Sequence, residues 1–149
     1  MGDETLSFDD LEIGREVVTH SRTITEADVR NYAGVSGDFN PLHLSERFTA
    51  EQTPFGEPVA HGALLFGITS GLLWQHRHER PDTIAFYGVD NLRFTNPVTM
   101  GTTVHAESEL IDKEPRDHPV ANGVARYETR LVTDDGEVAL SCELLTLVR

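Results

Sequence analysis

The sequence predicts an α+β fold in which an antiparallel sheet curls around one buried helix. From Gly62 to about Arg77, apolar side chains occupy almost every side of a helix, which is typical of a helix covered on all its faces. The segments that follow alternate between apolar and polar residues or are rich in β-branched residues, which favours strands. These strand-like segments are residues 84–94, 102–111, 120–133 and 138–148. A sheet that buries such a helix must wrap around it.

Glycines give further detail about the helix and the turns. Gly67 and Gly71 lie one turn apart in the apolar helix and cost helix propensity. We therefore expect another stretch of backbone to approach them closely. The strands are separated by turn signals such as Asp134-Asp135-Gly136.

The residues before the apolar helix predict shorter elements. Residues 16–24 are predicted to form a first strand. The pattern Thr25-Glu26-Ala27-Asp28 marks the start of a short helix, which we expect Gly34 to end. Residues 45–52 are predicted to form another helical turn, followed by a loop rich in Pro and Gly.

Length and composition predict a single domain spanning residues 1–149, because this length buries a proper core and no repeat or change of composition divides it. Cys142 is the only cysteine, which excludes a disulfide framework and indicates a small core residue.

The first residues lack the basic and apolar regions of a signal peptide. The longest apolar stretch, residues 63–74, is too short to span a bilayer. We therefore expect a soluble, cytoplasmic protein.

The charge of the chain excludes several partners. A net charge of −13 argues against binding to nucleic acid or to an anionic membrane, since both require a cationic surface. Lys113 is the only lysine among 12 basic residues, against 25 acidic ones. Either a GC-rich coding bias or adaptation to a salty cytoplasm could produce this composition, and we favour the salt adaptation because salt screens the repulsion between acidic groups.

Residues 36–43, Ser-Gly-Asp-Phe-Asn-Pro-Leu-His, carry the strongest indication of chemistry. Asn40 precedes a proline and is pushed to an extended conformation, while Pro41 fixes its own φ. Asp38 and Asn40 can each bond the neighbouring backbone. The segment therefore predicts a rigid, non-helical bend with an acid, Asp38, and a base, His43, at its two ends. Such a pair can share proton transfers on one substrate or water. Taken alone, the segment could equally be an ordinary turn.

Together with other segments, this motif resembles the MaoC-like dehydratase family, which includes the R-specific enoyl-CoA hydratases. The resemblance rests on Tyr32, on residues 36–43, on Pro58-Val59-Ala60-His61-Gly62, and on Asn91 to Val98 with Gly101-Thr102. It covers roughly residues 8–149, and it implies the hotdog fold, a sheet wrapped around one long helix. The chain departs from the family pattern at Ser45, often acidic in the family, and at Ala60, often Ser.

The resemblance implies a reaction and roles for particular residues. Asp38 and His43 would hold a water that adds to the β-carbon of a trans-2-enoyl-CoA, giving the R-3-hydroxyacyl-CoA. The Gly62 N–H, at the start of the apolar helix, is the expected oxyanion donor because helix N-termini present unpaired amides. We expect no cofactor and no metal. The further substrate-binding candidates are Asn40, Ala60, His61 and Arg93.

For three of these candidates the sequence leaves alternatives open. His61 could line the pocket or cap the helix. Arg93 could meet the coenzyme A phosphates or form a structural ion pair. Asn40 is better suited to bracing the bend than to touching substrate.

The same residues bear on other functions. A hotdog thioesterase would need a carboxylate on the central helix, and residues 62–74 contain none. A non-catalytic hotdog subunit that binds acyl thioesters is disfavoured, because both Asp38 and His43 are present. Within the hydratases, the acyl group could be short, medium or a branched dicarboxylic one. The resemblance also implies a homodimer or an assembly of dimers.

Overall fold

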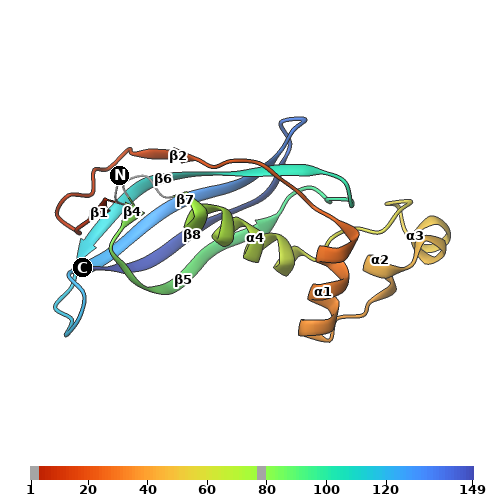
Figure 1. Cartoon of the computed structure of the whole chain (residues 1–149), viewed down its shortest axis with the longest axis horizontal. Helices are drawn as coiled ribbons and strands as arrows, with labels where there is room; N and C mark the ends of the chain where they lie inside the picture. Colours follow the sequence, from red (N-terminus) through yellow and green to blue (C-terminus); the bar gives the residue numbers. More distant parts are fainter. Residues whose placement is uncertain (1–3, 77–79) are drawn as a thin grey trace.

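A computed structural model describes residues 4–76 and 80–149. Within these residues, one sheet has six strands, and its path runs β2-β6-β7-β8-β5, with β3 also pairing with β6. Helix α4 lies along the concave side of the sheet, and the three shorter helices lie together beyond one end of it (Figure 1). The sheet consists of β2 Glu16–Val18, β3 Arg22–Thr23, β5 Thr83–Phe94, β6 Thr103–Pro115, β7 Gly123–Thr133 and β8 Val138–Val148. The remaining elements are β1 Thr5–Leu6, β4 Arg80–Pro81, α1 Glu26–Ser36, α2 Pro41–Leu44, α3 Glu46–Gln52 and α4 Gly62–Gln75.

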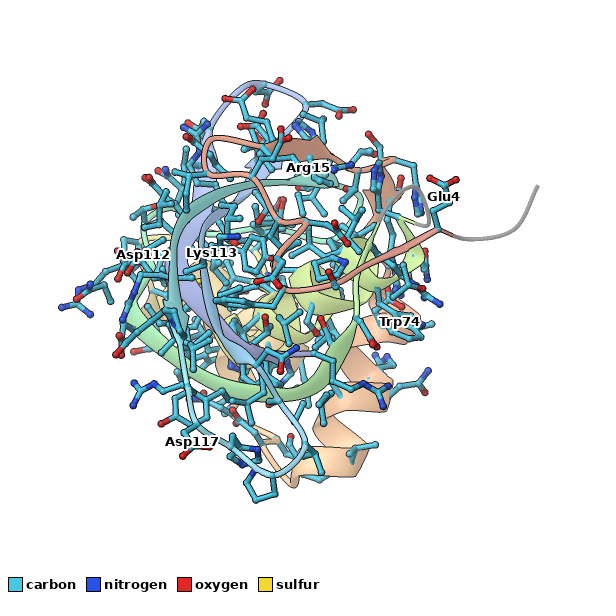
Figure 2. All side chains as sticks on the ribbon, turned by 90° about the vertical axis from the view of Figure 1, so that its left-hand side faces the viewer. Glu4, Arg15, Trp74, Asp112, Lys113 and Asp117 are labelled. Carbon is cyan, nitrogen blue, oxygen red and sulfur yellow. The ribbon has the colours of Figure 1, made fainter. Side chains whose placement is uncertain are left out.

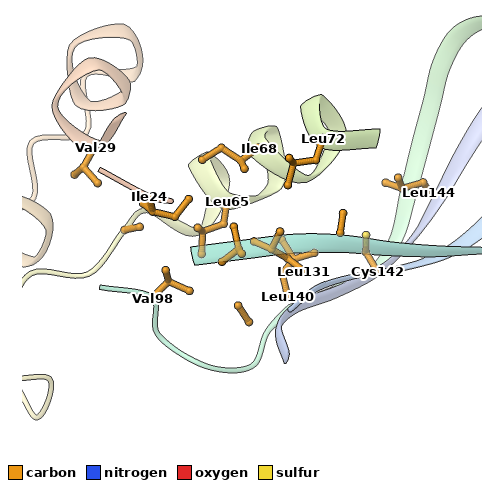
Figure 3. Packing of buried hydrophobic residues seen from close by; sticks show 14 residues of the cluster. Ile24, Val29, Leu65, Ile68, Leu72, Val98, Leu131, Leu140, Cys142 and Leu144 are labelled. Carbon is orange, nitrogen blue, oxygen red and sulfur yellow. The ribbon is translucent and has the colours of Figure 1, made fainter. Parts of the chain in front are cut away.

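The four long strands confirm the strand predictions to within a few residues. They pair antiparallel, and Gly136 at φ +83° makes the tight turn between β7 and β8. Alternate residues on the concave face, such as Val104, Leu131 and Leu140, are fully buried. They pack against the face of α4 that carries Leu65, Ile68 and Leu72 (Figure 3).

Helix α4 is covered on one side only in the single chain. Ala63, Gly67, Ser70 and Trp74 are exposed along the other side. A Cβ built on Gly67 or Gly71 would meet no other part of the described chain within 4 Å. The close backbone approach that we expected at these glycines is therefore wrong within the chain.

Two expectations near the N-terminus are also corrected. The first strand is not continuous, because residues 19–21 separate β2 from β3. The Thr19 hydroxyl accepts the Ala106 N–H in place of a backbone carbonyl. Helix α1 begins with the expected capping box of Thr25 and Asp28, but it runs past Gly34 and ends at Gly37. Gly37 is in the left-handed conformation at φ +78°, which only glycine adopts without strain, whereas Gly34 keeps helical geometry.

Two further predictions concern Cys142 and the apolar helix. Cys142 is buried in the core as expected, and burial raises the pKa of its thiol to about 11. Such a thiol packs as a small apolar group. In the part of the chain that the structure describes, no helix has the length and apolar character that crossing a membrane requires.

Candidate active site

Four hydrogen bonds within the segment hold the bend after α1 in place. The Ser36 hydroxyl accepts the Asp38 N–H at 3.1 Å, and the Asp38 Oδ1 accepts the Asn40 N–H at 3.2 Å. The Asn40 side chain then caps α2 by accepting the Leu42 N–H at 3.0 Å, and the Asn40 carbonyl accepts the His43 N–H at 2.9 Å. The bend is thus non-helical only as far as Asn40. His43 lies in a short helix that Pro41 begins, which corrects the expectation that it ends a non-helical turn.

Asp38 and His43 face each other across a short gap. The His43 Nε2 lies 3.8 Å from the Asp38 Oδ2, while the His43 Nδ1 lies 2.6 Å from the Val59 carbonyl oxygen. A carbonyl only accepts, so Nδ1 carries the proton, and Nε2 of the neutral ring is an acceptor that points to the carboxylate. The gap is too long for a direct hydrogen bond. The His43 side chain is 10% exposed and that of Asp38 49%, so the gap opens on the Asp38 side.

His61 completes this cluster. Its ring stacks on the His43 ring with 3.7 Å between centroids, and Tyr32 packs edge-on against its other side at 4.7 Å. The His61 Nε2 lies 3.0 Å from the Asp38 carbonyl oxygen, and its side chain makes no bond that caps α4. Of the two alternatives for His61, capping is therefore wrong. The ring instead holds the Asp38 backbone against His43.

Gly62 begins α4 beside this cluster. No described residue accepts a hydrogen bond from its N–H, which is the expected state of the first amide of a helix. The Phe94 ring edge lies against Gly62, so that a Cβ built there would be only 2.9 Å from the ring. The preceding segment is fixed by the buried Ala60, whose N–H donates to the Val98 carbonyl at 2.7 Å.

The remaining candidates lie at the edge of the cluster or outside it. Arg93 is exposed on β5 next to Phe94, and its guanidinium donates to the Leu92 carbonyl. Among the described residues it forms no ion pair, so nothing in that part of the chain supports the structural ion pair considered for it. The Asn40 side chain is used in capping α2, as the bracing role required.

A cleft of about 650 Å³ borders His43 on the side away from the gap. Neither Asp38 nor Gly62 lines it, and its charged residues are three glutamates and Arg30, which is paired with Glu26. Such a cleft repels phosphate groups. The gap between Asp38 and His43 is therefore a better candidate for the site than this cleft.

Asp38, His43 and His61 also form a group that could hold a metal ion, with one ligand atom from each within 4.8 Å of the others. The two rings stack with 3.7 Å between their centroids and 28° between their planes. One nitrogen of each ring already meets a carbonyl oxygen. The arrangement favours hydrogen bonding, and the expectation of no metal stays a prediction.

Sequence reasoning missed two parts of the site. The Val59 carbonyl orients the His43 ring, and the Phe94 ring covers Gly62. Both residues stand in the motifs that carried the family resemblance. Phe94 is next to Arg93 in the motif, so it could have been identified from the sequence. Every residue has a backbone carbonyl, so nothing in the sequence marks the one of Val59.

The fold and the site together define an α+β protein whose sheet wraps around a helix, with an acid and an imidazole beside the N-terminus of that helix. The sequence model of the MaoC like domain matches residues 9–132. The chain therefore belongs to the MaoC-like dehydratase family. It is 36% identical to the (R)-specific enoyl-CoA hydratase of Aeromonas caviae over 138 residues, which covers 93% of this chain and 96% of that protein. It is 40% identical over 97 residues to Protein MaoC of Klebsiella aerogenes, covering 65% of this chain but only 28% of that longer protein.

Solved structures agree with this assignment. The Monoamine oxidase regulatory protein of Archaeoglobus fulgius superposes with a TM-score of 0.89 at 32% identity, covering 97% of this chain and 95% of that one. A conserved hypothetical protein of Mycobacterium tuberculosis with a double hotdog fold superposes with a TM-score of 0.82 at 18% identity, covering 97% of this chain and 44% of that one. The predicted hotdog fold is confirmed.

Proposed function

We propose that the protein is a hydro-lyase that adds water reversibly to trans-2-enoyl-CoA and forms the R-3-hydroxyacyl-CoA. The observation that carries this proposal is the pair of acceptors, His43 Nε2 and Asp38 Oδ2, that face each other at 3.8 Å. Water has two hydrogens to donate, so one water in the gap can satisfy both acceptors. The (R)-specific enoyl-CoA hydratase of Aeromonas caviae, similar over nearly its whole length, supports the same reaction.

The chemistry follows from these positions. As the water oxygen bonds to the β-carbon, the pair accepts one of its protons, and the electrons of the double bond move toward the thioester oxygen. The Gly62 N–H, at the positive end of α4, stabilises the charge on that oxygen. The proton held by the pair is then delivered to the α-carbon, so that one water is added in all. Dehydration is the reverse sequence.

The other site residues support this geometry in different ways. His61 holds the Asp38 carbonyl and stacks on His43, and the backbone of Ala60 is tied to Val98. We assign these residues and Asn40 to the walls and the bracing of the substrate site. Arg93, exposed beside Phe94, is the candidate for meeting the coenzyme A phosphates.

We also propose a homodimer, or an assembly of dimers, of single-domain cytoplasmic chains. Strand β5 lies at the edge of the sheet, and Phe86 and Tyr87 on it are 52% and 56% exposed. A long edge strand with exposed aromatic residues is suited to pairing with a second copy. A stable, active monomer in light scattering at micromolar concentration would contradict this proposal.

The test of the reaction is an assay of purified protein against a panel of enoyl-CoA substrates. We expect loss of the enoyl absorbance and, by chiral analysis, an R product. An S product, or no hydration of any member of the panel, would refute the proposed function.

A further inference from the structure

Asn91 has an unusual backbone conformation in the edge strand β5. Its φ is +54°, and it is the only described residue other than glycine with a positive φ. The conformation coincides with a β-bulge, since β5 advances from Asp90 to Arg93 while β8 advances only from Glu143 to Ser141. Strand β5 therefore holds one extra residue at this point. Asparagine tolerates a positive φ better than most residues do, and bulges beside functional sites commonly redirect a side chain.

The bulge changes which side chains of β5 face α4. Val89 and Leu92 both pack against the hydrophobic core, although they are three residues apart. In a regular strand only residues two apart share a face. The extra residue shifts this alternation, so that Leu92 and Phe94 face α4 and Arg93 lies exposed between them. A regular continuation from Val89 would turn Asn91 and Arg93 toward α4 and Phe94 away from it.

Side chains from three strands hold the bulge in place. The Asn91 side-chain amide donates to the Glu143 Oε2 on β8 at 3.1 Å. The Arg126 guanidinium on β7 donates to the same oxygen at 3.0 Å and to the Asp90 Oδ2 at 2.8 Å. Asp90 and Glu143 lie directly opposite each other in the sheet, so Arg126 also offsets the repulsion between these carboxylates.

Phe94, just after the bulge, meets the proposed oxyanion donor. Its ring lies against Gly62, at the place where any other residue would carry a Cβ. The ring therefore limits the movement of the first residue of α4 and keeps water from one side of it, which strengthens a hydrogen bond from its N–H. The next residue fixes the end of the strand, because the Thr95 N–H donates to the Ala139 carbonyl at 3.0 Å.

The same segment also reaches His43. The Val98 carbonyl accepts the Ala60 N–H at 2.7 Å, and Thr99 forms a β-bridge with Val59. The Val59 carbonyl in turn accepts the His43 Nδ1–H at 2.6 Å. The stretch from the bulge to Thr99 therefore contacts the residues on both sides of the proposed site.

We propose that Asn91 is a positioning residue for the reaction: its left-handed backbone forms the bulge that places Phe94 against Gly62, and the ring in turn fixes the oxyanion donor. Asn91 itself does not touch the substrate. This inference rests on the proposed function.

The first test reads the structure of the site without turnover. An aromatic ring shifts the NMR signals of protons close to it, so the signals of Gly62 should report the Phe94 ring, and Phe94→Leu identifies this shift. We expect Asn91→Val to lose the shift, because a β-branched residue is strained at positive φ, and Asn91→Gly to keep it. Asn91→Ala takes the place of Asn91→Val if thermal melts show the valine variant to be unfolded. An unchanged Gly62 signal in the folded variant would overturn the inference.

The second test measures kcat with a short enoyl-CoA. Asn91→Val should lower kcat by about 10- to 100-fold, because a small displacement of a reacting group has effects of this size, whereas Asn91→Gly should stay close to wild type. When Phe94→Leu is already present, Asn91→Val should cost little more, since the ring through which it acts is absent.

Gly14→Val is the matched control, because Gly14 also has a positive φ, +89°. Its neighbour Arg15 lies at the end of the molecule opposite to helices α1 to α3, the end that faces the viewer in Figure 2. This variant should lower the melting temperature while the folded protein keeps its kcat.

Two outcomes separate a positioning role from a merely structural one. If the costs of Asn91→Val and Phe94→Leu multiply, or if Asn91→Gly loses as much activity as Asn91→Val, the inference is wrong. If Asn91→Val removes the ring from Gly62 in the NMR spectra while the wild-type protein hydrates no enoyl-CoA, the placement of Phe94 by the bulge stands and the proposed reaction falls.

Discussion

The two ends of α4 differ in how they are built. At the N-terminal end, polar groups come from two short segments, residues 36–43 and 58–62, and hydrogen bonds to nearby backbone fix them. At the C-terminal end, a cavity of about 530 Å³ is formed by side chains from strands and loops far apart in the sequence, and two of its hydroxyl groups have no partner among the described residues. Local turns therefore position the Asp38 and His43 side chains, whereas long-range packing shapes the cavity.

This comparison predicts a division between the roles of the two ends of α4. Changes at the N-terminal end should reduce turnover with every substrate, because they act on the reacting atoms. Changes at the C-terminal end should alter stability, because they act on a cavity wall. The following predictions test this division, beginning with the largest effect.

The largest effect is expected from the acid and the imidazole. Asp38→Asn and His43→Gln each remove one acceptor from the gap, and general acid–base roles are typically worth about 10²–10⁴-fold in rate. Asparagine can still accept the Asn40 N–H, so the bend should survive. Steady-state kinetics with a short enoyl-CoA, together with circular dichroism, measures both effects. A folded variant with near wild-type turnover would show that the assignment of the pair is wrong.

Gly62→Pro should have the next largest effect, since loss of one oxyanion donor costs about 10²–10³-fold in kcat. Proline is tolerated at the first helical position, and His61, at φ −59° and ψ 134°, already has the conformation that a residue before proline prefers.

Any Cβ at position 62, that of proline included, would press on the Phe94 ring. Phe94→Leu is therefore added to both variants, and the matched control for Gly62→Pro is the Gly62→Ala double variant, which keeps the N–H. We expect this double variant to be more active than the proline variant. Equal losses would mean that Gly62 provides space and not a hydrogen bond.

At the opposite end of α4, Thr146→Val should increase stability. The Thr146 hydroxyl is buried and has no partner among the described residues, so replacing it with a methyl group should raise the free energy of unfolding by about 1 kcal/mol. Thr129→Val is the control, because the fully buried Thr129 hydroxyl bonds the Ser108 hydroxyl at 3.1 Å and its loss should destabilise. Urea denaturation measures both. If Thr146→Val destabilises as much as Thr129→Val does, the Thr146 hydroxyl has a partner in the folded protein.

The smallest effect is expected from salt. Salt screens repulsion among the acidic groups that give the net charge of −13, so activity and melting temperature should rise from low to molar salt. The glutamates around the cleft beside His43 belong to this surface, whereas the described walls of the cavity at the other end carry no acidic group. A flat or falling response in a thermal melt would favour the coding-bias explanation of the composition.

The elements of this fold follow from short-range patterns in the sequence. Alternation over ten or more residues predicted β5 to β8, and the pattern of Thr25 and Asp28 predicted the start of α1. The segment around Asp38 and Asn40 predicted the bend. The helix start and the bend depend on hydrogen bonds between residues two or three apart, so the local sequence determines them. The alternation in the strands marks the buried face, although their hydrogen bonds join distant residues. The end of α1 was misplaced because Gly34 and Gly37 look alike in the sequence, and only the path of the chain decides which one adopts a positive φ.

The tertiary structure alone decided which side chains meet. His43 and Val59 are 16 residues apart, and Asp38 and His61 are 23 apart. The residues that line the cavity at the C-terminal end of α4 come from most of the length of the chain. Such contacts depend on strand register and on how α4 lies in the curved sheet, and a shift of one residue in register turns every side chain to the other face. The sequence by itself thus determined the candidate residues of the site. The distances between them, and the cavity at the C-terminal end of α4, depend on the packing of the whole chain.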